Sequence, residues 1–398
     1  MLTTTQALEA ILAAMPELPA ESVSLQASAG RVLRQVVTAE RDQPPFDRVM
    51  MDGIAIAHDT CVGGARSFVV QATQAAGDPA LSLDPDAAIE IMTGASLPEN
   101  ADCIIPVERI SVAEGVATLE DGYEPAHRQF IHARASDHSA GTALLHAGRR
   151  IAPADIAVIA SAGLASVDVT RPAVTRVIST GNELVAAGED IAPHQIRMSN
   201  GPALVALLAR HGHTDCEHEH IADDPEALRE RIGVHLGEAD ALILSGGVSM
   251  GKADYVPEVL ADLGVEVTFH RISQRPGKPM WFGTGPRGQA VFALPGNPVS
   301  ALVCCRQYVI PALENASGVA ESPPEFASLA SDVRFEPDLT CFQPVKLVSN
   351  AAGQVLAMPV TTNTSGDFTA LAGTDGYVEL AKEESHFPAG SSVFLRRW

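Results

Sequence analysis

The chain has 398 residues, more than a single hydrophobic core normally organises, so we expect several domains. It carries 27 Lys and Arg against 49 Asp and Glu, which gives a formal net charge of −22. A field of that sign repels nucleic acids and acidic membrane surfaces, and no basic patch offsets it, so both are excluded as partners.

Export and membrane insertion are not expected either. The N-terminus has no basic segment followed by an apolar core, and no apolar run reaches the roughly 18 residues that a membrane helix needs. The six cysteines include no C-x-x-C pair, which is typical of reduced thiols. A cytoplasmic protein is therefore predicted.

The chain is predicted to begin in a discontinuous α+β linking domain made of residues 1–43 and 142–172. Thr3 and Gln6 have the spacing of a capping box, and apolar residues then recur at helical spacing until the next proline. A Gln-Pro-Pro sequence later forbids helix and marks a boundary. After the intervening residues 44–141, helix and strand patterns return, and a helix is expected over 153–162.

The interruption, residues 44–141, is predicted to be a β-rich insert domain. Short β-like runs alternate there with Gly, Pro and Asp. Asp52, Thr93 and Asp137 are polar residues beside its turns. Each alone is more typical of turn chemistry than of catalysis.

Residues 173–317 are predicted to form a doubly wound, mostly parallel α/β sheet domain, because strand and helix patterns alternate. The strands are expected at 174–178, 215–221, 241–244, 265–270 and 290–294, and the helices at 200–208, 223–236, 254–263 and after Pro298. Asn200 is expected to cap the first of these helices. Residues 318–398 return to short alternating runs, which predicts a C-terminal β-barrel or sandwich.

The loop after the strand at 241–244 is the first candidate site. Open parallel sheets bind ligands beyond the carboxyl ends of their strands. Ser245 is followed by Gly246 and Gly247, which can adopt positive φ and let backbone N–H groups approach an anion. The alternative is an ordinary connection in which the glycines only turn the chain, and this loop alone favours that reading.

Three further loops of this domain leave strand ends in the same way. They are 179–183, 274–279 and 294–300. In the last, Asn297 is expected as a helix cap with Pro298 at the first helical position, which would make an anion site. Arg275 and Lys278 supply positive charge nearby.

Three acids in these loops oppose a simple phosphate site. Glu183, Asp223 and Asp254 lie at strand ends or helix starts, and carboxylates repel phosphate unless a hard cation lies between them. Mg²⁺ held by one or two carboxylates and substrate phosphate would resolve the conflict. The alternative for the two aspartates is simple helix capping, whereas Glu183 has no such structural explanation.

Residues 211–220, with the sequence HGHTDCEHEH, resemble a metal cluster in composition. Cys216, His218 and His220 would share one face of a strand, but His211 and His213 would fall on a helix end and a turn. An exposed edge or polar strand face is the favoured interpretation.

Together, and in this order, these loops resemble the molybdopterin molybdenumtransferase family, MoeA and the E domain of gephyrin. The resemblance covers nearly the whole chain and rests on the motifs PPFDRVMMDGIAI (44–56), IMTGASLPENAD (91–102), RASDHSAG (134–141), STGNEL (179–184), DDP (223–225), SGGVSMGKADY (245–255), PGKP (276–279) and LPGNPVSA (294–301). It implies Mg²⁺-dependent insertion of molybdate into adenylylated molybdopterin with release of AMP. It also implies a homodimer, with the enzyme that makes the adenylylated pterin as a further partner.

The resemblance assigns roles to particular residues. The implied catalytic acids are Asp52, Asp137, Glu183, Asp223 and Asp254, with Asp223 and Asp254 as metal ligands. The implied substrate-binding residues are Thr93, Thr180, Gly181, Ser245, Gly246, Gly247, Arg275, Lys278, Pro295, Gly296, Asn297, Pro298 and Ser300.

The sequence departs from the family's usual pattern at Arg48, Ile54, Ala135 and Arg275. Arginine in place of lysine at the last position keeps the charge but replaces a point donor by a planar fork. Two other functions stay open at this point. One is a molybdopterin adenylyltransferase, and the other is a scaffold that binds pterin without turnover.

Overall fold

The computed structural model describes residues 1–247, 255–362 and 364–398, and Asp254 therefore lies outside the described residues. The chain divides into two compact units. The first unit is Met1–Gln35, Ala147–Ala152 and Ser166–Trp398, and the second unit is Val36–His146 and Pro153–Ala165. The boundaries of the four domains expected from the sequence stay a prediction.

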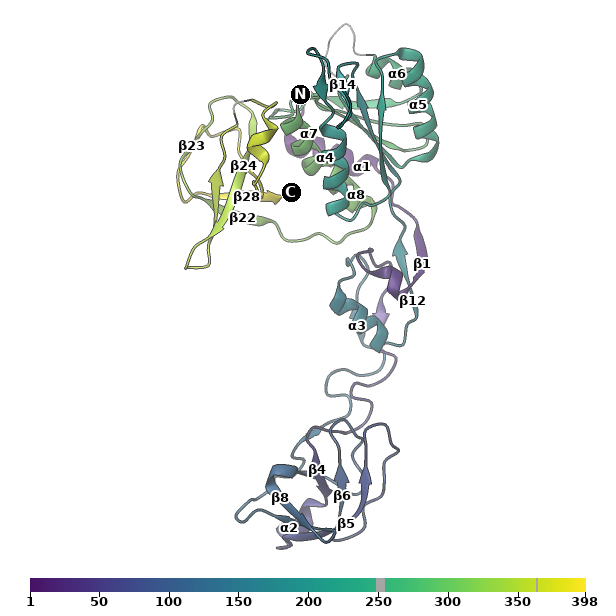
Figure 1. Cartoon of the computed structure of the whole chain (residues 1–398), viewed down its shortest axis with the longest axis vertical. Coiled ribbons are helices and arrows are strands. Elements are labelled where there is room, and N and C mark those ends of the chain that lie inside the picture. The colour runs from purple at the N-terminus through teal and green to yellow at the C-terminus, as the bar shows by residue number, and fades with distance from the viewer. Residues whose placement is uncertain (248–254, 363) are drawn as a thin grey trace. The chain divides into compact units, whose positions relative to one another are not determined.

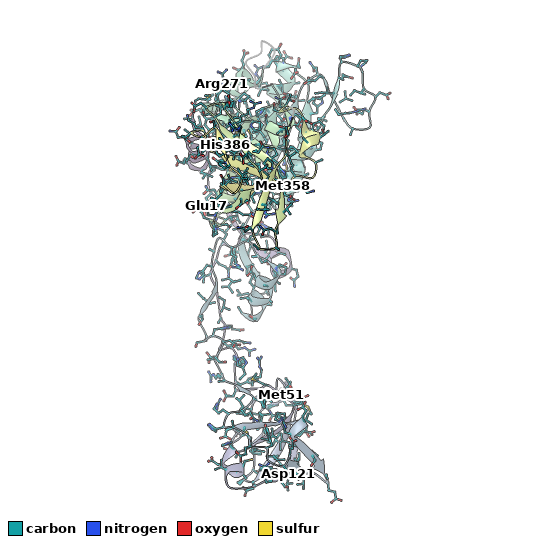
Figure 2. All side chains as sticks on the ribbon, turned by 90° about the vertical axis from the view of Figure 1, so that its left-hand side faces the viewer. Glu17, Met51, Asp121, Arg271, Met358 and His386 are labelled. Atoms are coloured by element: carbon teal, nitrogen blue, oxygen red, sulfur yellow. The ribbon has the colours of Figure 1, made fainter. Side chains whose placement is uncertain are left out.

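The second unit is built on a six-stranded sheet with the strand order β7-β4-β6-β5-β9-β8. Its strands are β4 (Gly53–Ile56), β5 (Ser67–Gln74), β6 (Ala87–Ile91), β7 (Cys103–Pro106), β8 (Ile110–Ala113) and β9 (Val116–Leu119). Ala55 packs into a cluster on one face, whereas Ile54 and Ile56 pack into a cluster on the other. The predicted β-rich insert is thus confirmed, and Met51 and Asp121 belong to it (Figure 2).

Smaller elements complete the second unit. They are β2 (Val37–Thr38) paired with β11 (Ala143–Leu145), β3 (Arg48–Val49) paired with β10 (Ile131–His132), α2 (His58–Val62), η2 (Val107–Arg109) and α3 (Pro153–Ser161). The last of these confirms the helix expected over 153–162.

The first unit contains the α/β domain, a six-stranded sheet with the order β16-β13-β17-β21-β20-β18. The first four strands are parallel, and β20 and β18 are antiparallel additions. The strands are β13 (Thr175–Thr180), β16 (Cys216–Ile221), β17 (Ala241–Ser245), β18 (Glu266–His270), β20 (Trp281–Thr284) and β21 (Ala290–Leu294). The predicted mostly parallel sheet is confirmed.

Helices cover both faces of this sheet, so its central strands are apolar throughout. Successive residues of β17 face opposite sides: Ile243 packs with α1, α4, α7 and α8, and Leu242 with α5 and α6 (Figure 1). The helices are α1 (Thr4–Ala14), α4 (Asn200–Arg210), α5 (Pro225–Glu238), α6 (Val256–Asp262), α7 (Pro298–Cys304) and α8 (Ile310–Ala316), with a π-helical turn, η3 (Cys305–Val309), between the last two. Thr3 and Gln6 form the predicted capping box of α1.

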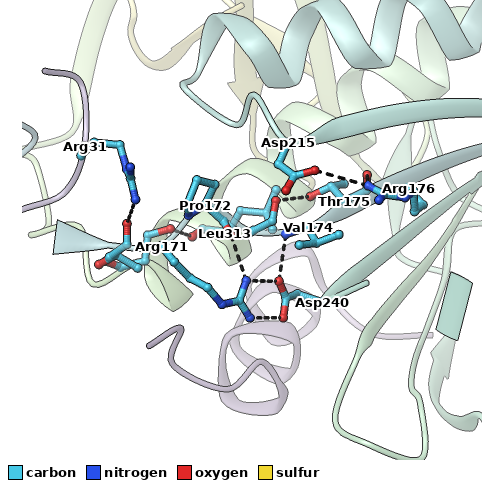
Figure 3. Close-up of polar contacts among 12 residues, drawn as sticks. Arg31, Arg171, Pro172, Val174, Thr175, Arg176, Asp215, Asp240 and Leu313 are labelled. Carbon is cyan, nitrogen blue, oxygen red and sulfur yellow. Dashed lines mark hydrogen bonds and ion pairs between the residues drawn. The ribbon is translucent and has the colours of Figure 1, made fainter. Parts of the chain in front are cut away.

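We call the starts of the parallel strands the amino edge of the sheet. Asp240, just before β17, accepts hydrogen bonds from two guanidinium nitrogens of Arg171 at 2.7 Å and from the Val174 N–H at 2.8 Å (Figure 3). Arg176 lies 3.5 Å from Asp215 at the start of β16. Polar groups at this edge therefore hold the strand starts together.

The C-terminal part of the first unit is a closed β-barrel, as predicted. The strands follow the order β24-β25-β22-β28-β26, and β26 pairs back with β24. They are β22 (Glu325–Leu329), β24 (Thr340–Ser349), β25 (Val355–Pro359), β26 (Gly376–Leu380) and β28 (Ser392–Arg397). Met358 in β25 and His386 in β27 (His386–Phe387) belong to this part of the chain (Figure 2).

The first unit also contains short elements, and one of them links its α/β domain to its barrel. β19 (Gln274–Arg275) leaves the α/β domain and pairs with β24 of the barrel. The others are β1 (Ala20–Ser24) paired with β12 (Ser166–Thr170), β14 (Leu184–Val185) paired with β15 (Ile196–Arg197), β23 (Val333–Arg334) paired with β27, η1 (Leu25–Ser28) and η4 (Phe368–Leu371). No helix in the described ranges is both long and apolar enough to cross a membrane.

Candidate functional site

A cavity of about 410 Å³ lies beyond the carboxyl ends of β13, β17 and β21, which we call the carboxyl edge. It is lined by three of the loops that the sequence singled out and by the barrel segment around η4. The predicted site residues among its lining are Thr180, Glu183, Ser245, Gly246, Gly296, Asn297 and Pro298. The structure thus brings together loops of which the first and last, at Thr180 and Gly296, are more than a hundred residues apart in the chain.

Glycine is required at two positions of the loop after β17. Gly246 and Gly247 have φ of +100° and +64°, as expected from the sequence. A Cβ at Gly246 would lie 2.7 Å from the Thr180 carbonyl oxygen, and one at Gly247 would lie 2.8 Å from Thr180 Oγ1. The loop therefore lies directly against the end of β13, where no side chain fits.

Asn200 belongs to this site, although the sequence suggested only a helix cap. Helix α4 begins at Asn200, and no side chain caps it. Instead, Asn200 Nδ2 donates hydrogen bonds to Ser245 Oγ at 2.9 Å and to the Gly296 carbonyl at 2.8 Å. This amide ties two of the site's loops together, and only the tertiary structure reveals the role.

Asn297 occupies the predicted cap position of α7, with Pro298 following, but its side chain makes no capping bond. Its Nδ2 donates to Ser365 Oγ at 2.7 Å, and the Val299 N–H donates to the Ser365 carbonyl at 3.1 Å. These bonds attach the barrel segment next to η4 to the carboxyl edge. Pro295 and Ser300 are buried and do not line this cavity.

Two predicted acids flank the turn after β13. The carboxylate of Glu183 folds over Gly181, whose φ is +144° and whose Cβ would lie 2.6 Å from Glu183 Oε2. Asp223 Oδ2 accepts from the Asn182 N–H at 3.3 Å. Asp224, one residue later, is the residue that caps α5, with Oδ1 accepting from the Ala227 N–H at 2.8 Å. Capping therefore does not explain Asp223.

Arg275 and Lys278 lie outside the 410 Å³ cavity. Arg275 instead lines a second cavity, of about 470 Å³, together with Arg334 and Ser365 from the barrel segment. Lys278 is exposed and lines neither cavity. Ser365 and Gly366 are adjacent residues that line different cavities, so the two spaces are neighbours.

The remaining predicted acids belong to the second unit. Asp52 Oδ1 accepts from the Thr93 backbone N–H at 2.6 Å and from its hydroxyl at 2.7 Å. The hydroxyl bond, followed by the backbone bond, holds the pKa of Asp52 below its usual value. Thr93 thus keeps this exposed carboxylate ionised and oriented.

Asp137 takes part in a chain of three side chains. Its Oδ1 lies 3.0 Å from His132 Nε2, and His132 Nδ1 lies 3.0 Å from a guanidinium nitrogen of Arg48. Arginine can only donate, so Nδ1 must accept, and the proton of a neutral ring is on Nε2, which donates to Asp137. Arg48, one of the departures from the family pattern, therefore selects the tautomer that orients Asp137.

Residues 211–220 place their histidines in separate interactions. β16 is an edge strand, as favoured from the sequence, where His218 Nε2 pairs with Ser179 Oγ and His220 Nε2 with the Gly181 carbonyl, both at 2.9 Å. His213 is buried at the amino edge, and burial lowers its pKa to about 4. No group of three metal-ligating side chains occurs in the part of the chain that the structure describes.

Three family models match successive parts of the chain. The MoeA N-terminal region (domain I and II) matches residues 2–163, a probable molybdopterin binding domain matches 176–315, and the MoeA C-terminal region (domain IV) matches 327–395. The 410 Å³ cavity is lined mainly by residues of the second model.

Full-length relatives agree with these models. A molybdopterin molybdenumtransferase from Synechocystis sp. is 38% identical over 100% of both chains, and one from Haemophilus influenzae is 32% identical over 99% of this chain and 98% of the relative. Two crystal structures of a molybdopterin biosynthesis MoeA protein from Pyrococcus horikoshii match with TM-scores of 0.83 and 0.82, at 29% and 25% identity and full coverage of both chains.

Proposed function

Because this chain belongs to the molybdopterin molybdenumtransferase family, enzymes of molybdenum cofactor biosynthesis, we propose that it inserts molybdate into adenylylated molybdopterin and releases AMP. The observation that carries the proposal is the cavity at the carboxyl edge. It combines a glycine turn at Gly246, where a ligand can approach the backbone closely, with the carboxylate-bearing residue Glu183. A phosphate-bearing substrate needs the former, and a cation that offsets its charge needs the latter.

The residues of the turn after β13 fit a Mg²⁺ requirement. The Glu183 carboxylate lies against Gly181, and Asp223 accepts a hydrogen bond from the next residue, Asn182. Mg²⁺ characteristically takes one or two carboxylates and completes its shell with phosphate oxygens and water. We assign Mg²⁺ to these two acids and to Asp254. The ion would neutralise charge on the phosphate groups as AMP leaves.

The second cavity suits the oxyanion substrate. Arg275, Arg334 and Ser365 line it, with Asp332 as the one acid among its described lining residues. A planar fork of N–H donors matches the oxygens of a tetrahedral oxyanion such as molybdate. Lys278, exposed in the same loop as Arg275, would add long-range attraction in a strongly acidic protein.

The proposal extends to the second unit and to assembly. We assign Asp52 and Asp137 to the reaction, with Thr93 and His132 orienting their carboxylates. We further propose a cytoplasmic homodimer, with the enzyme that makes the adenylylated pterin as a further partner. Sedimentation equilibrium of the purified chain tests the homodimer, and a monomer at micromolar concentration would contradict it.

The reaction is tested directly with purified protein, adenylylated molybdopterin, molybdate and Mg²⁺. We expect stoichiometric release of AMP together with molybdenum cofactor that reconstitutes a cofactor-free molybdoenzyme. Removing Mg²⁺ with EDTA should stop both, and adding Mg²⁺ back should restore them. If authentic substrate releases no AMP under these conditions, the proposed reaction is wrong.

A further inference from the structure

The strand that carries Arg275 is held from its other side by a buried polar chain. Gln274 and Arg275 form β19, and successive strand residues point to opposite sides. Arg275 is exposed and lines the second cavity, whereas Gln274 is completely buried. The side of the strand that faces away from the proposed oxyanion site therefore faces the core of the protein.

The Gln274 amide closes the turn that follows Arg275. Its Nε2 donates to the Pro276 carbonyl at 3.0 Å, so the bond spans the arginine. The next residue, Gly277, has φ of +92°, and a Cβ there would lie 2.4 Å from Cys304 Sγ in α7 and 2.7 Å from Gln274 Nε2. The turn therefore lies directly against α7 and the Gln274 side chain, where no other side chain fits.

Tyr308 fixes the orientation of this amide. The Pro276 carbonyl can only accept, so the NH₂ group of Gln274 faces it and Oε1 faces the other way. Oε1 accepts a hydrogen bond from the Tyr308 hydroxyl. Burial raises the pKa of Tyr308, so the phenol keeps the proton that it donates. Both side chains are completely buried, so water does not replace this bond when it is removed.

Tyr308 lies in η3, the π-helical turn between α7 and α8. Such turns are rare and are frequent at functional sites. The preceding residue, Gln307, accepts from the hydroxyl of Tyr377 in β26 at 2.7 Å. Two successive residues of one turn therefore make the same kind of bond in two directions, one to the barrel and one to the strand that carries Arg275.

We propose that Gln274 and Tyr308 are positioning residues for the oxyanion substrate. Through the Pro276 carbonyl they hold the turn that keeps Arg275 at the second cavity. Neither side chain lines that cavity, so both act through Arg275. The inference rests on the proposed function, which assigns molybdate to this cavity. A turn that is ordered before the oxyanion arrives need not be ordered at the expense of binding, so loss of the chain should weaken affinity.

The central variant is Tyr308→Phe, which removes only the hydroxyl. Molybdate binding to the full chain is measured by calorimetry, and KM and kcat are measured from AMP release. We expect the dissociation constant and the KM for molybdate to rise by about fivefold to tenfold, with kcat at saturating molybdate within about twofold of the unaltered protein. The KM for adenylylated pterin should not change. Unchanged molybdate affinity and KM in the folded variant would overturn the proposal.

Tyr377→Phe is the matched control. It also removes a completely buried tyrosine hydroxyl that donates to a glutamine, and its bond ends in the same π-helical turn but runs to the barrel. Both variants should lower the thermal unfolding temperature, because each leaves a buried amide oxygen without its donor. Only Tyr308→Phe should weaken molybdate binding. Equal weakening in both variants would show a general loosening of η3 and would refute the positioning role.

A second variant tests whether the two residues act as one chain. Gln274→Met keeps the length of the side chain but removes both of its bonds, so it should raise the KM for molybdate at least as much as Tyr308→Phe. The double variant should be no worse than Gln274→Met alone. Effects that multiply would show that the two residues act independently. Gln274→Met also replaces Tyr308→Phe as the test if the latter does not fold, which circular dichroism checks.

Arg275→Ala should abolish molybdate binding. If that variant keeps the affinity of the unaltered protein, the turn holds nothing that binds the oxyanion, and the proposal is wrong. The positioning role and the proposed reaction fail separately. Weakened molybdate binding in Tyr308→Phe without any AMP release from the unaltered protein would refute only the reaction. AMP release with the same KM for molybdate in both proteins would refute only the positioning role.

Discussion

Asp240 at the amino edge of the α/β sheet and the side-chain oxygens of Asn200 and Thr180 at its carboxyl edge differ in their hydrogen bonding. At the amino edge, Asp240 receives three hydrogen bonds from Arg171 and Val174. At the carboxyl edge, Asn200 and Thr180 line a cavity, and their side-chain oxygens Oδ1 and Oγ1 are buried without a partner among the described residues. Asp240 is thus fully paired within the chain, although His213 Nε2 at the same edge has no partner among the described residues, whereas the two oxygens at the carboxyl edge are both unpaired.

This difference separates stability from function within one sheet. Removing a paired group at the amino edge leaves its partners without a hydrogen bond and should destabilise the fold. Removing an unpaired group at the carboxyl edge leaves no other group of the free protein without a partner. Such a change should affect only binding or turnover. Four substitutions test this division.

The largest effect is expected for Glu183→Gln at the carboxyl edge. Glutamine keeps the shape but removes the negative charge, so we expect turnover to fall about a hundredfold or more. AMP release measures the effect, with Glu189→Gln, a nearby exposed acid outside the cavity, as the control. If Glu183→Gln lowers the free energy of unfolding but leaves turnover unchanged, the carboxyl edge serves stability, and the proposed difference between the two edges is wrong.

Asp240→Ala at the amino edge should have the converse effect. It leaves the Arg171 guanidinium and the Val174 N–H without their acceptor, and we expect the free energy of unfolding to fall by about 3 kcal/mol. Urea unfolding measures this change. Turnover per folded molecule should stay at the level of the unaltered protein, and a large loss would show that the two edges are coupled.

His213, also at the amino edge, predicts a pH dependence of stability. Its folded pKa of about 4 lies below the ordinary value because the ring is buried. The unfolded chain therefore binds a proton as pH falls below about 6.5 while the folded chain does not, so this contribution is present above about pH 6.5 and is lost toward pH 4.

Between pH 7 and pH 5 the His213 contribution amounts to about 2 kcal/mol of lost stability. Urea unfolding at both values should show a smaller loss in His213→Leu than in the unaltered protein. If the two proteins lose stability in parallel, protonation of His213 is not the cause.

The smallest effect is expected for Asp262→Ala. Asp262 pairs with Arg229 at 2.5 Å, but both side chains are about half exposed, at 49% and 45%. Such a pair contributes less than about 1 kcal/mol, so neither unfolding nor turnover should change measurably. If Asp262→Ala lowers the free energy of unfolding as much as Asp240→Ala does, then the presence of an ion pair, and not its position at the strand starts, determines the loss of stability.

Much of the fold could be predicted because it depends on local patterns. The apolar run 241–244 matches a strand buried on both faces, and Thr3 with Gln6 forms the expected capping box. The loops of the site were predictable for a related reason, since parallel strands deliver their carboxyl ends to one edge. Side-chain roles were less accessible: Asn200 and Asn297 were expected to cap helices and instead join separate loops.

The sequence by itself determined the order of elements, the glycine turns and the set of acids, because each depends on residue type and spacing along the chain. Only the tertiary structure decided which of these groups meet. Asn200, Gly296 and Phe368 are far apart in sequence, and their meeting at one cavity depends on how strands stack and how the barrel segment attaches. Hydrogen bonds between distant residues have no local signature, so the pairing of Asp240 with Arg171 and the bonds of Asn200 to Ser245 and Gly296 could not be seen in the sequence.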